Sequence, residues 1–134
     1  MAQFEEVGEA EVIDEWLDKH TGTGIECYTH TIKVYFPVAS RKAEEEFEEL
    51  LKACNEVFGG STVYDAEGSW CEEKPCREVI REPVKVIEAS HHCTEEWQRE
   101  RFAEALKKAA RNTNQQAVAI KGTNRFFIIP SHLL

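Results

Sequence analysis

Apolar and polar residues alternate from Ile25 to Val38, which predicts a strand with one apolar face. The apolar side carries Ile32, Val34 and Phe36, and the other side carries Thr31, Lys33 and Tyr35. Later stretches that predict strands cover 61–70, 78–90 and 117–129. Because proline cannot donate a ladder hydrogen bond, we expect regular pairing of the 78–90 strand to start after Pro83. Gly122 to Asn124 can break the last strand into a hairpin.

Two stretches carry apolar residues at the spacing of an amphipathic helix. The first covers 41–58, with Ser40 as its N-cap and Gly59 and Gly60 as a left-handed stop. The second is capped by Thr94 and runs to about Arg111. The residues expected to face the core are Ala43, Phe47, Leu50, Leu51, Cys54, Val57 and Phe58 in the first helix, and Trp97, Phe102, Ala105, Leu106 and Ala109 in the second.

A shorter helix is predicted near the N-terminus, between Glu9 and Lys19, where Gly22 and Gly24 end it. The residues with helical spacing are Val12, Ile13, Trp16 and Leu17. We therefore divide the chain into an acidic N-terminal helical segment, 1–24, and a single α+β domain, 25–134.

The order of the elements in 25–134 is strand, helix, strand, strand, helix, strand. This is the order of the ferredoxin-like βαββαβ fold, in which a four-stranded antiparallel sheet carries both helices on one face. The other face must then be polar or be buried by another chain. The fold alone indicates no function.

The length of the chain indicates the number of domains, and its charge limits the kinds of partner. The 134 residues suit one domain, and 25 acidic against 16 basic side chains give a formal charge of −9. Residues 1–26 hold eight of the acids and one base, so the rest of the chain is close to neutral. Duplex nucleic acid requires a net basic face, so we do not expect it as a partner. The acidic segment is either a solvated surface or a site for a basic partner.

The sequence predicts a cytoplasmic protein without a membrane partner. No apolar run approaches the roughly 20 residues of a membrane-spanning helix. The acidic N-terminus is unlike a signal peptide. Five cysteines in no regular framework fit reduced thiols in a reducing compartment.

Two motifs carry a resemblance to a known family. They are Gly60-Ser-Thr-Val-Tyr-Asp-Ala-Glu-Gly-Ser-Trp70 and Val79-Ile-Arg-Glu-Pro-Val-Lys-Val86. They resemble the Thr-Val-x-x-(x)-x-Gly-x-Trp and Arg-Glu-Pro-x-Lys strands of a family of small bacterial and viral domains of unknown function, over roughly 28–130. The resemblance implies a ferredoxin-like unit and no particular activity. Neither the cysteine pair Cys71 and Cys76 nor the acidic helix belongs to the family's pattern.

The first candidate site is the start of the first long helix, at Ser40, Arg41 and Lys42. Two consecutive bases there oppose the helix macrodipole by roughly a few tenths of a kcal/mol each. In the expected fold, the basic end of the second helix lies beside them. A helix N-terminus ringed by bases suits a phosphate or carboxylate. Ordinary solvated helix ends explain the same residues.

The second candidate is the junction at His91 and His92, which follows a predicted strand and precedes a helix. Imidazole can act as a general acid or base near neutral pH, and free amides at a helix start can hold an oxyanion. Adjacent side chains point to different sides of the chain, so only one of them faces any given pocket. A capped loop with exposed histidines is the alternative.

Cysteines that lie near these histidines in the sequence are candidate zinc ligands together with them. The Cys-x4-Cys spacing of Cys71 and Cys76 is looser than that of zinc knuckles, and no second tight pair follows. The hairpin tip and the His91 junction are also expected at opposite ends of the sheet. We therefore predict no metal site. Hairpin geometry places Cys71 across from Cys76, either bridged or reduced.

The uncovered sheet face is the last candidate. Tyr35 faces away from the helices, and Tyr64 and Trp70 share one side of their strand. Interleaved with Lys33, Arg81 and Lys85, such aromatic residues can stack a ring and hold an anion. The same surface can instead close a two-fold dimer, since exposed aromatic residues on a sheet are generally covered.

Three hypotheses of function follow. The first is a small oligomeric protein, a homodimer or larger, that binds an anionic small molecule such as a nucleotide without catalysis and without a cofactor. Its ligand would lie at the helix start or on the open face, against Tyr35, Trp70, Arg81 and Lys85. The second is an enzyme that uses His91 or His92 as general acid or base in phosphoester or ring-opening chemistry. The third is an interaction or inhibitor module that uses the acidic N-terminal segment.

Overall fold

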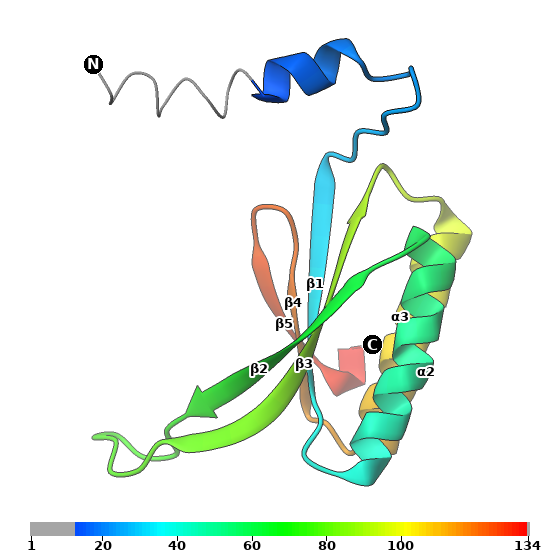
Figure 1. The fold of residues 1–134 in the computed structure, drawn as a ribbon. Coiled ribbons are helices and arrows are strands. Elements are labelled where there is room, and N and C mark those ends of the chain that lie inside the picture. Colours follow the sequence, from blue (N-terminus) through cyan, green and yellow to red (C-terminus); the bar gives the residue numbers. More distant parts are fainter. Residues whose placement is uncertain (1–12, 134) are drawn as a thin grey trace, which may run out of the picture.

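Five strands form one antiparallel sheet in the computed structural model of this chain, which describes residues 13–133 (Figure 1). The strands are β1 (His30–Pro37), β2 (Thr62–Trp70), β3 (Ile80–His91), β4 (Ala117–Lys121) and β5 (Phe126–Pro130). They pair in the order β2-β3-β1-β4-β5. The α+β class and the antiparallel sheet are confirmed, but the expected four strands are five.

The fifth strand exists because the last predicted strand folds back on itself. The Gly122 N–H donates to the Arg125 carbonyl at 2.7 Å and closes a two-residue turn. Five residue pairs, from Lys121 opposite Phe126 to Ala117 opposite Pro130, then join β4 to β5. The sheet therefore gains an edge strand made of Phe126-Phe-Ile-Ile-Pro130.

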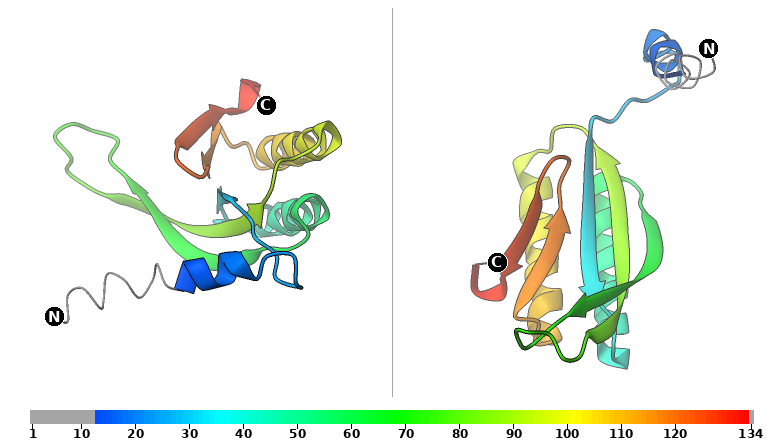
Figure 2. Two further views of the ribbon diagram at one scale, coloured as in Figure 1. Left: turned by 90° about the horizontal axis from the view of Figure 1, so that it is seen from above. Right: turned by 90° about the vertical axis from the view of Figure 1, so that its left-hand side faces the viewer.

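Two helices, α2 (Arg41–Phe58) and α3 (Glu96–Asn112), pack side by side on the same face of the sheet (Figure 2). A short 3-10 turn, η1 (Ser131–Leu133), follows β5. Among residues 13–133, none of the helices combines the length and the apolar character needed to cross a membrane. The largest fully buried side chains in this part of the chain are Phe36, Phe47, Leu50, Ile87, Val34, Val86 and Cys54. Because both helices pack on one face of the sheet, the opposite face is left uncovered, as expected.

Local signals place both ends of α2 where the sequence predicts them. The Ser40 hydroxyl accepts a hydrogen bond from the Ala43 N–H at 3.1 Å, which satisfies one free amide of the first turn. At the other end, Gly59 adopts φ 87° and donates its N–H to the Asn55 carbonyl at 2.8 Å. A left-handed residue at this position stops the helix.

Substitution of Gly59 is expected to destabilise the fold, whereas the same change at Gly60 is not. Gly59→Ala should cost about 1–2 kcal/mol, because a Cβ disfavours the left-handed backbone. Gly60 has no positive φ, and an added Cβ there meets no atom within 4 Å, so Gly60→Ala is the matched control. Urea unfolding of both variants measures the difference. Equal midpoints would contradict the assignment of Gly59 as the helix stop.

The start of α3 differs from the prediction. Glu95, rather than Thr94, is the N-cap residue, and its N–H donates to the Gln98 side-chain oxygen at 2.7 Å. Trp97, expected in the core, is 53% exposed, and its indole N–H donates to the Glu95 carboxylate at 2.9 Å. Its place in the first turn of α3 puts the indole on the surface, whereas Ala105, Leu106 and Ala109 are buried as predicted.

Pairing around Pro83 is more extensive than predicted. On the β1 side, pairing does begin after Pro83, with Val84 opposite Pro37. On the β2 side, however, it continues to Ile80 opposite Trp70. The Pro83 carbonyl accepts from the Val38 N–H at 3.0 Å, so the edge of Pro83 that lacks an N–H faces β1. No bond to β2 is lost, and the β2–β3 hairpin extends beyond the rest of the sheet (Figure 1).

The predicted N-terminal helix is present at residues 13–19, and its expected beginning lies outside the described residues. It projects beyond one end of the sheet, joined to β1 by an irregular segment (Figure 1). Its apolar residues Ile13, Trp16 and Leu17 are exposed. The division of the chain at residue 24 stays a prediction.

Candidate functional site

The uncovered sheet face forms a groove of about 770 Å³, which we call the open-face groove. The β2–β3 hairpin curls across this face toward β4, so that the sheet is concave (Figure 2). The lining comes from all five strands and one residue before β4: Tyr35, Pro37, Ala66, Glu67, Gly68, Ser69, Trp70, Glu82, Val84, Gln115, Ala117, Ala119, Phe126 and Ile128. The groove is therefore a product of the whole sheet rather than of one loop.

Strand register explains why this face is hollow. Small residues on β2 and β4, among them Ala66, Gly68, Ala117 and Ala119, form much of the floor. At Gly68 the fit is tight, because an added Cβ would lie 3.2 Å from Val84 Cγ2 and would require that side chain to shift. Large side chains from β1, β2 and β5 surround the small ones. The rings of Tyr35 and Phe126 are 5.9 Å apart, and Trp70 is exposed on the hairpin.

A single carboxylate, that of Glu82, is the charged group on the groove face of the sheet. Glu67 and Glu82 both border the groove and no lysine or arginine does, but Glu67 alternates with Ala66 and Gly68 along β2, so its side chain is on the other face. Arg81 Nη1 lies 3.1 Å from Glu67 Oε2. Among residues 13–133, Glu82 has no ion-pair partner. The electrostatics of the groove are thus suited to a neutral or positively charged guest.

The structure separates the residues predicted for the open face into two groups. Tyr35 and Trp70 line the groove. Lys85 does not, because its Nζ lies 5.5 Å from the ring centroid of Phe47, on the helix side of the sheet. Arg81 has the same parity on β3 as Lys85, since Trp70 pairs with Ile80 and Ser69 pairs with Arg81. Neither base is interleaved with the aromatic residues as the sequence suggested.

Lys33 is on the open face, but beyond the groove. Its Nζ lies 3.3 Å from Glu88 Oε1, and the Tyr64 hydroxyl donates to the same oxygen at 3.4 Å. The hydrogen bond to Glu88 raises the pKa of Lys33. The amine is therefore fully charged at neutral pH and is already engaged by a carboxylate.

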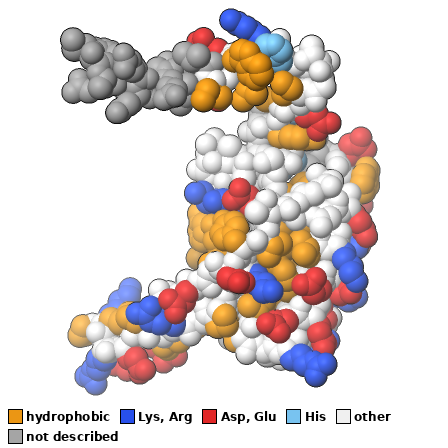
Figure 3. Space-filling view, in the orientation of Figure 1, with side chains coloured by type: hydrophobic (Ala, Val, Ile, Leu, Met, Phe, Trp, Pro, Cys, Tyr) orange, Lys and Arg blue, Asp and Glu red, His pale blue; other side chains and the backbone are white. Residues whose placement is uncertain are grey.

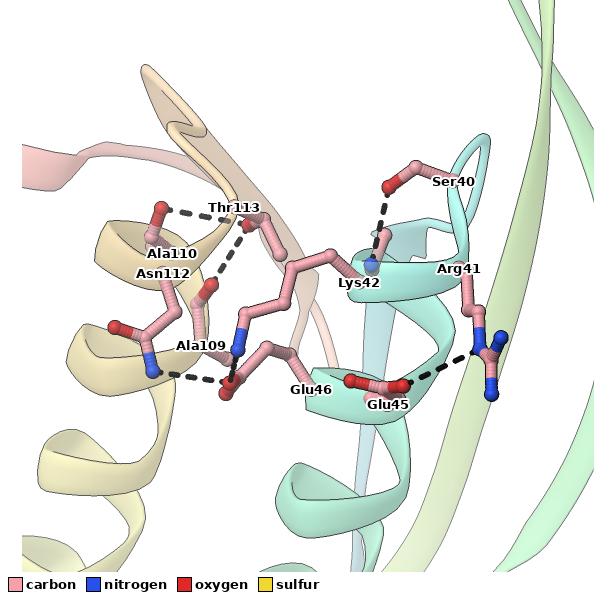
Figure 4. Close-up of polar contacts among 10 residues, drawn as sticks. Ser40, Arg41, Lys42, Glu45, Glu46, Ala109, Ala110, Asn112 and Thr113 are labelled. Carbon is pink, nitrogen blue, oxygen red and sulfur yellow. Dashed lines mark hydrogen bonds and ion pairs between the residues drawn. The ribbon is translucent and has the colours of Figure 1, made fainter.

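The bases at the start of α2 also have carboxylate partners (Figure 4). Arg41 Nε lies 3.5 Å from Glu45 Oε1, and Lys42 Nζ lies 3.1 Å from Glu46 Oε1. Asn112, at the end of α3, donates to the same Glu46 oxygen at 3.0 Å. The predicted proximity of the two helix ends is present, but here it centres on a buried carboxylate. An ordinary helix end explains Ser40, Arg41 and Lys42 without a bound anion.

His91 and His92 point to different neighbours, as expected for adjacent residues. The His91 ring lies between those of His30 and Phe58, at 5.5 Å and 5.2 Å between centroids, and the His92 ring lies 4.7 Å from that of Tyr28. His91 Nδ1 is also 2.6 Å from the His92 carbonyl oxygen. Because His91 pairs with the first residue of β1, while the open-face groove includes Pro37 at the other end, the histidines and the groove are not one site.

Cys71 and Cys76 form a disulfide at the tip of the β2–β3 hairpin. The tip and the His91 junction are at opposite ends of β3, as predicted. Within residues 13–133, no cluster of three or more histidine, cysteine or acidic side chains has the arrangement of a metal site.

Sequence reasoning missed Phe126, Ile128 and Glu82 as groove residues. Phe126 and Ile128 alternate with Phe127 in an apolar run, which was a usable signal of a strand with two apolar faces. Their position beside Tyr35 depends on the fold-back of β5, which the sequence offered only as an option. Glu82 stands beside Pro83, where regular pairing was not expected.

Comparison with known proteins shows similarity at the level of the fold. No protein-family model matches the chain, and no curated protein sequence matches it. The structure of a phage SAM lyase in complex with S-methyl-5'-thioadenosine is similar, with a TM-score of 0.53 at 9% identity, over 79% of this chain and 95% of the lyase chain. The apo state of a phage SAM lyase gives 0.54 at 7% identity, over 77% and 90%.

Proposed function

We propose that this protein binds a nucleoside-sized small molecule in the open-face groove. The observation that carries the proposal is the concave sheet face, on which the rings of Tyr35, Trp70 and Phe126 surround a floor of small side chains. The volume of about 770 Å³ lies within the range of about 300–1,000 Å³ typical of ligand pockets. Aromatic side chains on a sheet are suited to stacking a nucleobase.

The charge of the groove limits the classes of ligand that fit it. An anionic nucleotide is the expectation from the sequence, but Arg81 and Lys85 are on the helix side, and Glu82 is on the groove face. A phosphate there would meet a carboxylate rather than a base. We therefore favour a neutral or cationic nucleoside over a nucleotide.

An adenosyl thioether or sulfonium compound fits these requirements. Its purine can stack on the aromatic rings, its thioether can contact Val84 and Ile128, and a sulfonium charge would be attracted to Glu82. The fold similarity to a phage SAM lyase whose structure holds S-methyl-5'-thioadenosine supports the same ligand class.

Calorimetric titration with S-methyl-5'-thioadenosine, SAM and ATP tests this proposal. We expect the first two to bind and ATP to bind at least about tenfold more weakly, because its phosphates are repelled by the Glu82 carboxylate. Trp70→Ala should weaken binding of S-methyl-5'-thioadenosine by about tenfold or more, since stacking on an aromatic ring contributes roughly 1–3 kcal/mol.

Trp97→Ala is the matched control, because this exposed tryptophan lies on α3, away from the open-face groove. It should leave the affinity unchanged. Absence of heat with all three compounds, or equal losses in the two tryptophan variants, would refute ligand binding in the groove.

Catalysis through His91 or His92 stays a separate hypothesis. A ligand in the open-face groove would lie near Pro37, whereas His91 is paired with His30 at the other end of β1. The binding proposal therefore requires neither imidazole. Turnover of a phosphoester or ring substrate that disappears with the double change to alanine would establish the enzyme alternative.

A further inference from the structure

The helix at residues 13–19 presents an apolar stripe that nothing in the described chain covers. Ile13 is 54% and Trp16 is 55% exposed, and Leu17 lies beside them. These are the spacings of one helix face. Acidic residues border the stripe at Asp14, Glu15 and Asp18. Three large apolar side chains exposed together, with a polar border, are typical of a docking surface.

The edge strand β5 presents the second uncovered apolar surface. Phe126 and Ile128 are 57% and 68% exposed, and Phe127 is half-exposed on the other side of the strand. Figure 3 shows hydrophobic side chains gathered at the surface in this part of the sheet. Natural edge strands are usually short, charged or covered, and the side chains of β5 carry no charge. Residues 13–133 of the same chain leave this strand uncovered, and we expect another surface to cover it.

Charge makes the two surfaces complementary. Lys121 pairs with Phe126 across the β4–β5 hairpin, and Arg125 stands in its turn. Neither base has an ion-pair partner among residues 13–133, and neither do Asp14, Glu15 and Asp18. An apolar stripe with an acidic border would thus meet an apolar strand with a basic border, and such complementarity favours correct pairing.

The helix is held away from β5 of its own chain. His20 Nδ1 lies 2.7 Å from the Trp16 carbonyl oxygen, and the Gly22 N–H donates to the Ile25 carbonyl at 3.2 Å. Beyond this turn, the ring of Tyr28 packs 4.7 Å from that of His92, at the end of the sheet. With this turn between the helix and the domain, the helix lies beyond the end of the sheet, clear of β5 (Figures 1 and 2).

From these observations, we infer that the N-terminal helix of one chain docks on strand β5 of a second copy, through Trp16 and Leu17 against Phe126 and Ile128 and through Asp14 and Asp18 against Lys121 and Arg125. The protein is then an oligomer held by exchanged helical arms. This inference does not rest on ligand binding, although the docked helix would lie at the rim of the open-face groove.

Charge reversal on each surface tests the inference, with the molar mass from light scattering as the readout. The wild-type protein should have at least twice the 15.4 kDa of one chain. Lys121→Glu with Arg125→Glu should halve that mass or reduce it further, and so should Asp14→Lys with Asp18→Lys, because each pair places like charges across the contact.

An equimolar mixture of the two charge-reversed proteins is the decisive measurement. Each arm then faces a strand of opposite charge, so the oligomer mass should return on mixing, whereas docking within one chain would give no such recovery. Lys108→Glu with Arg111→Glu on α3 has the same net charge change and should keep the wild-type mass. Circular dichroism of each variant shows that it is folded.

A monomeric wild-type protein would overturn the inference. So would a mass that survives either charge reversal, or a mixture that fails to recover it. Replacement of Trp16 and Leu17 by aspartate should also give monomers, and an unchanged mass in that variant would show that β5 is covered by something other than the helix.

Discussion

Phe36→Ala is expected to lower the free energy of unfolding by about 3–5 kcal/mol. Phe36, on the central strand β1, is completely buried on the side of helix α2, and its ring centroid lies 6.4 Å from that of Phe47. Removal of the ring leaves a cavity that neither helix can fill without moving. Because domains of this size are stable by only about 5–15 kcal/mol, the variant should lose a large share of its stability. Urea unfolding followed by circular dichroism measures the change.

Trp97→Ala provides the comparison, because it deletes an even larger side chain from an exposed position. We expect it to change the free energy of unfolding by less than about 1 kcal/mol. Similar losses in Phe36→Ala and Trp97→Ala would mean that the core does not lie between β1 and α2.

Cys54 is expected to resist thiol labelling that readily modifies Cys93. Burial in α2 raises the pKa of the Cys54 thiol to about 12, whereas Cys93 is exposed. Since the thiolate is the reactive form and an ordinary thiol has a pKa of about 8.5, Cys54 has on the order of a thousandfold less thiolate at pH 8. Mass spectrometry of peptides after labelling should therefore find Cys93 modified at least a hundredfold faster, by this order-of-magnitude estimate.

Denaturation in urea is the control for this experiment, because Cys54 should then react as fast as Cys93. Rapid labelling of Cys54 in the native protein would contradict its burial.

The raised pKa of Cys54 also makes the stability of the fold depend on pH. The unfolded chain releases the Cys54 proton from about pH 8.5 upward, while the folded chain keeps it until about pH 12. Stability contributed by this group is present below pH 8.5 and falls as the pH rises through that interval.

Elements with strong local signals could be predicted, and ambiguous ones could not. The stripe of Phe47, Leu50 and Cys54, together with Ser40 and Gly59 at the two ends, specifies α2 through contacts within a few residues. At the start of α3, Thr94 and Glu95 can both serve as the cap residue. The choice between them depends on how the chain leaves β3, which no local pattern records.

The groove was predictable only in part, for a similar reason. Alternation within a strand identifies Tyr35 and Trp70 as open-face residues. The faces of Arg81 and Lys85 depend on how β3 is aligned with β1 and β2, and this register is set by long-range pairing. The hollow itself requires the curl of the β2–β3 hairpin and the fold-back of β5, neither of which can be derived from a periodic pattern.

Strand β1 alternates between the helix-side core and the lining of the groove, so Tyr35 is flanked in sequence by Val34 and Phe36. Mutations that reshape this part of the lining must therefore preserve the packing directly beneath it. The hairpin and β5 face no such restriction, because most of their side chains are exposed. Over evolutionary time, related proteins should change ligand preference through the hairpin and β5 while keeping the β1 part of the lining nearly constant, and libraries for altered specificity should be concentrated in the hairpin and β5.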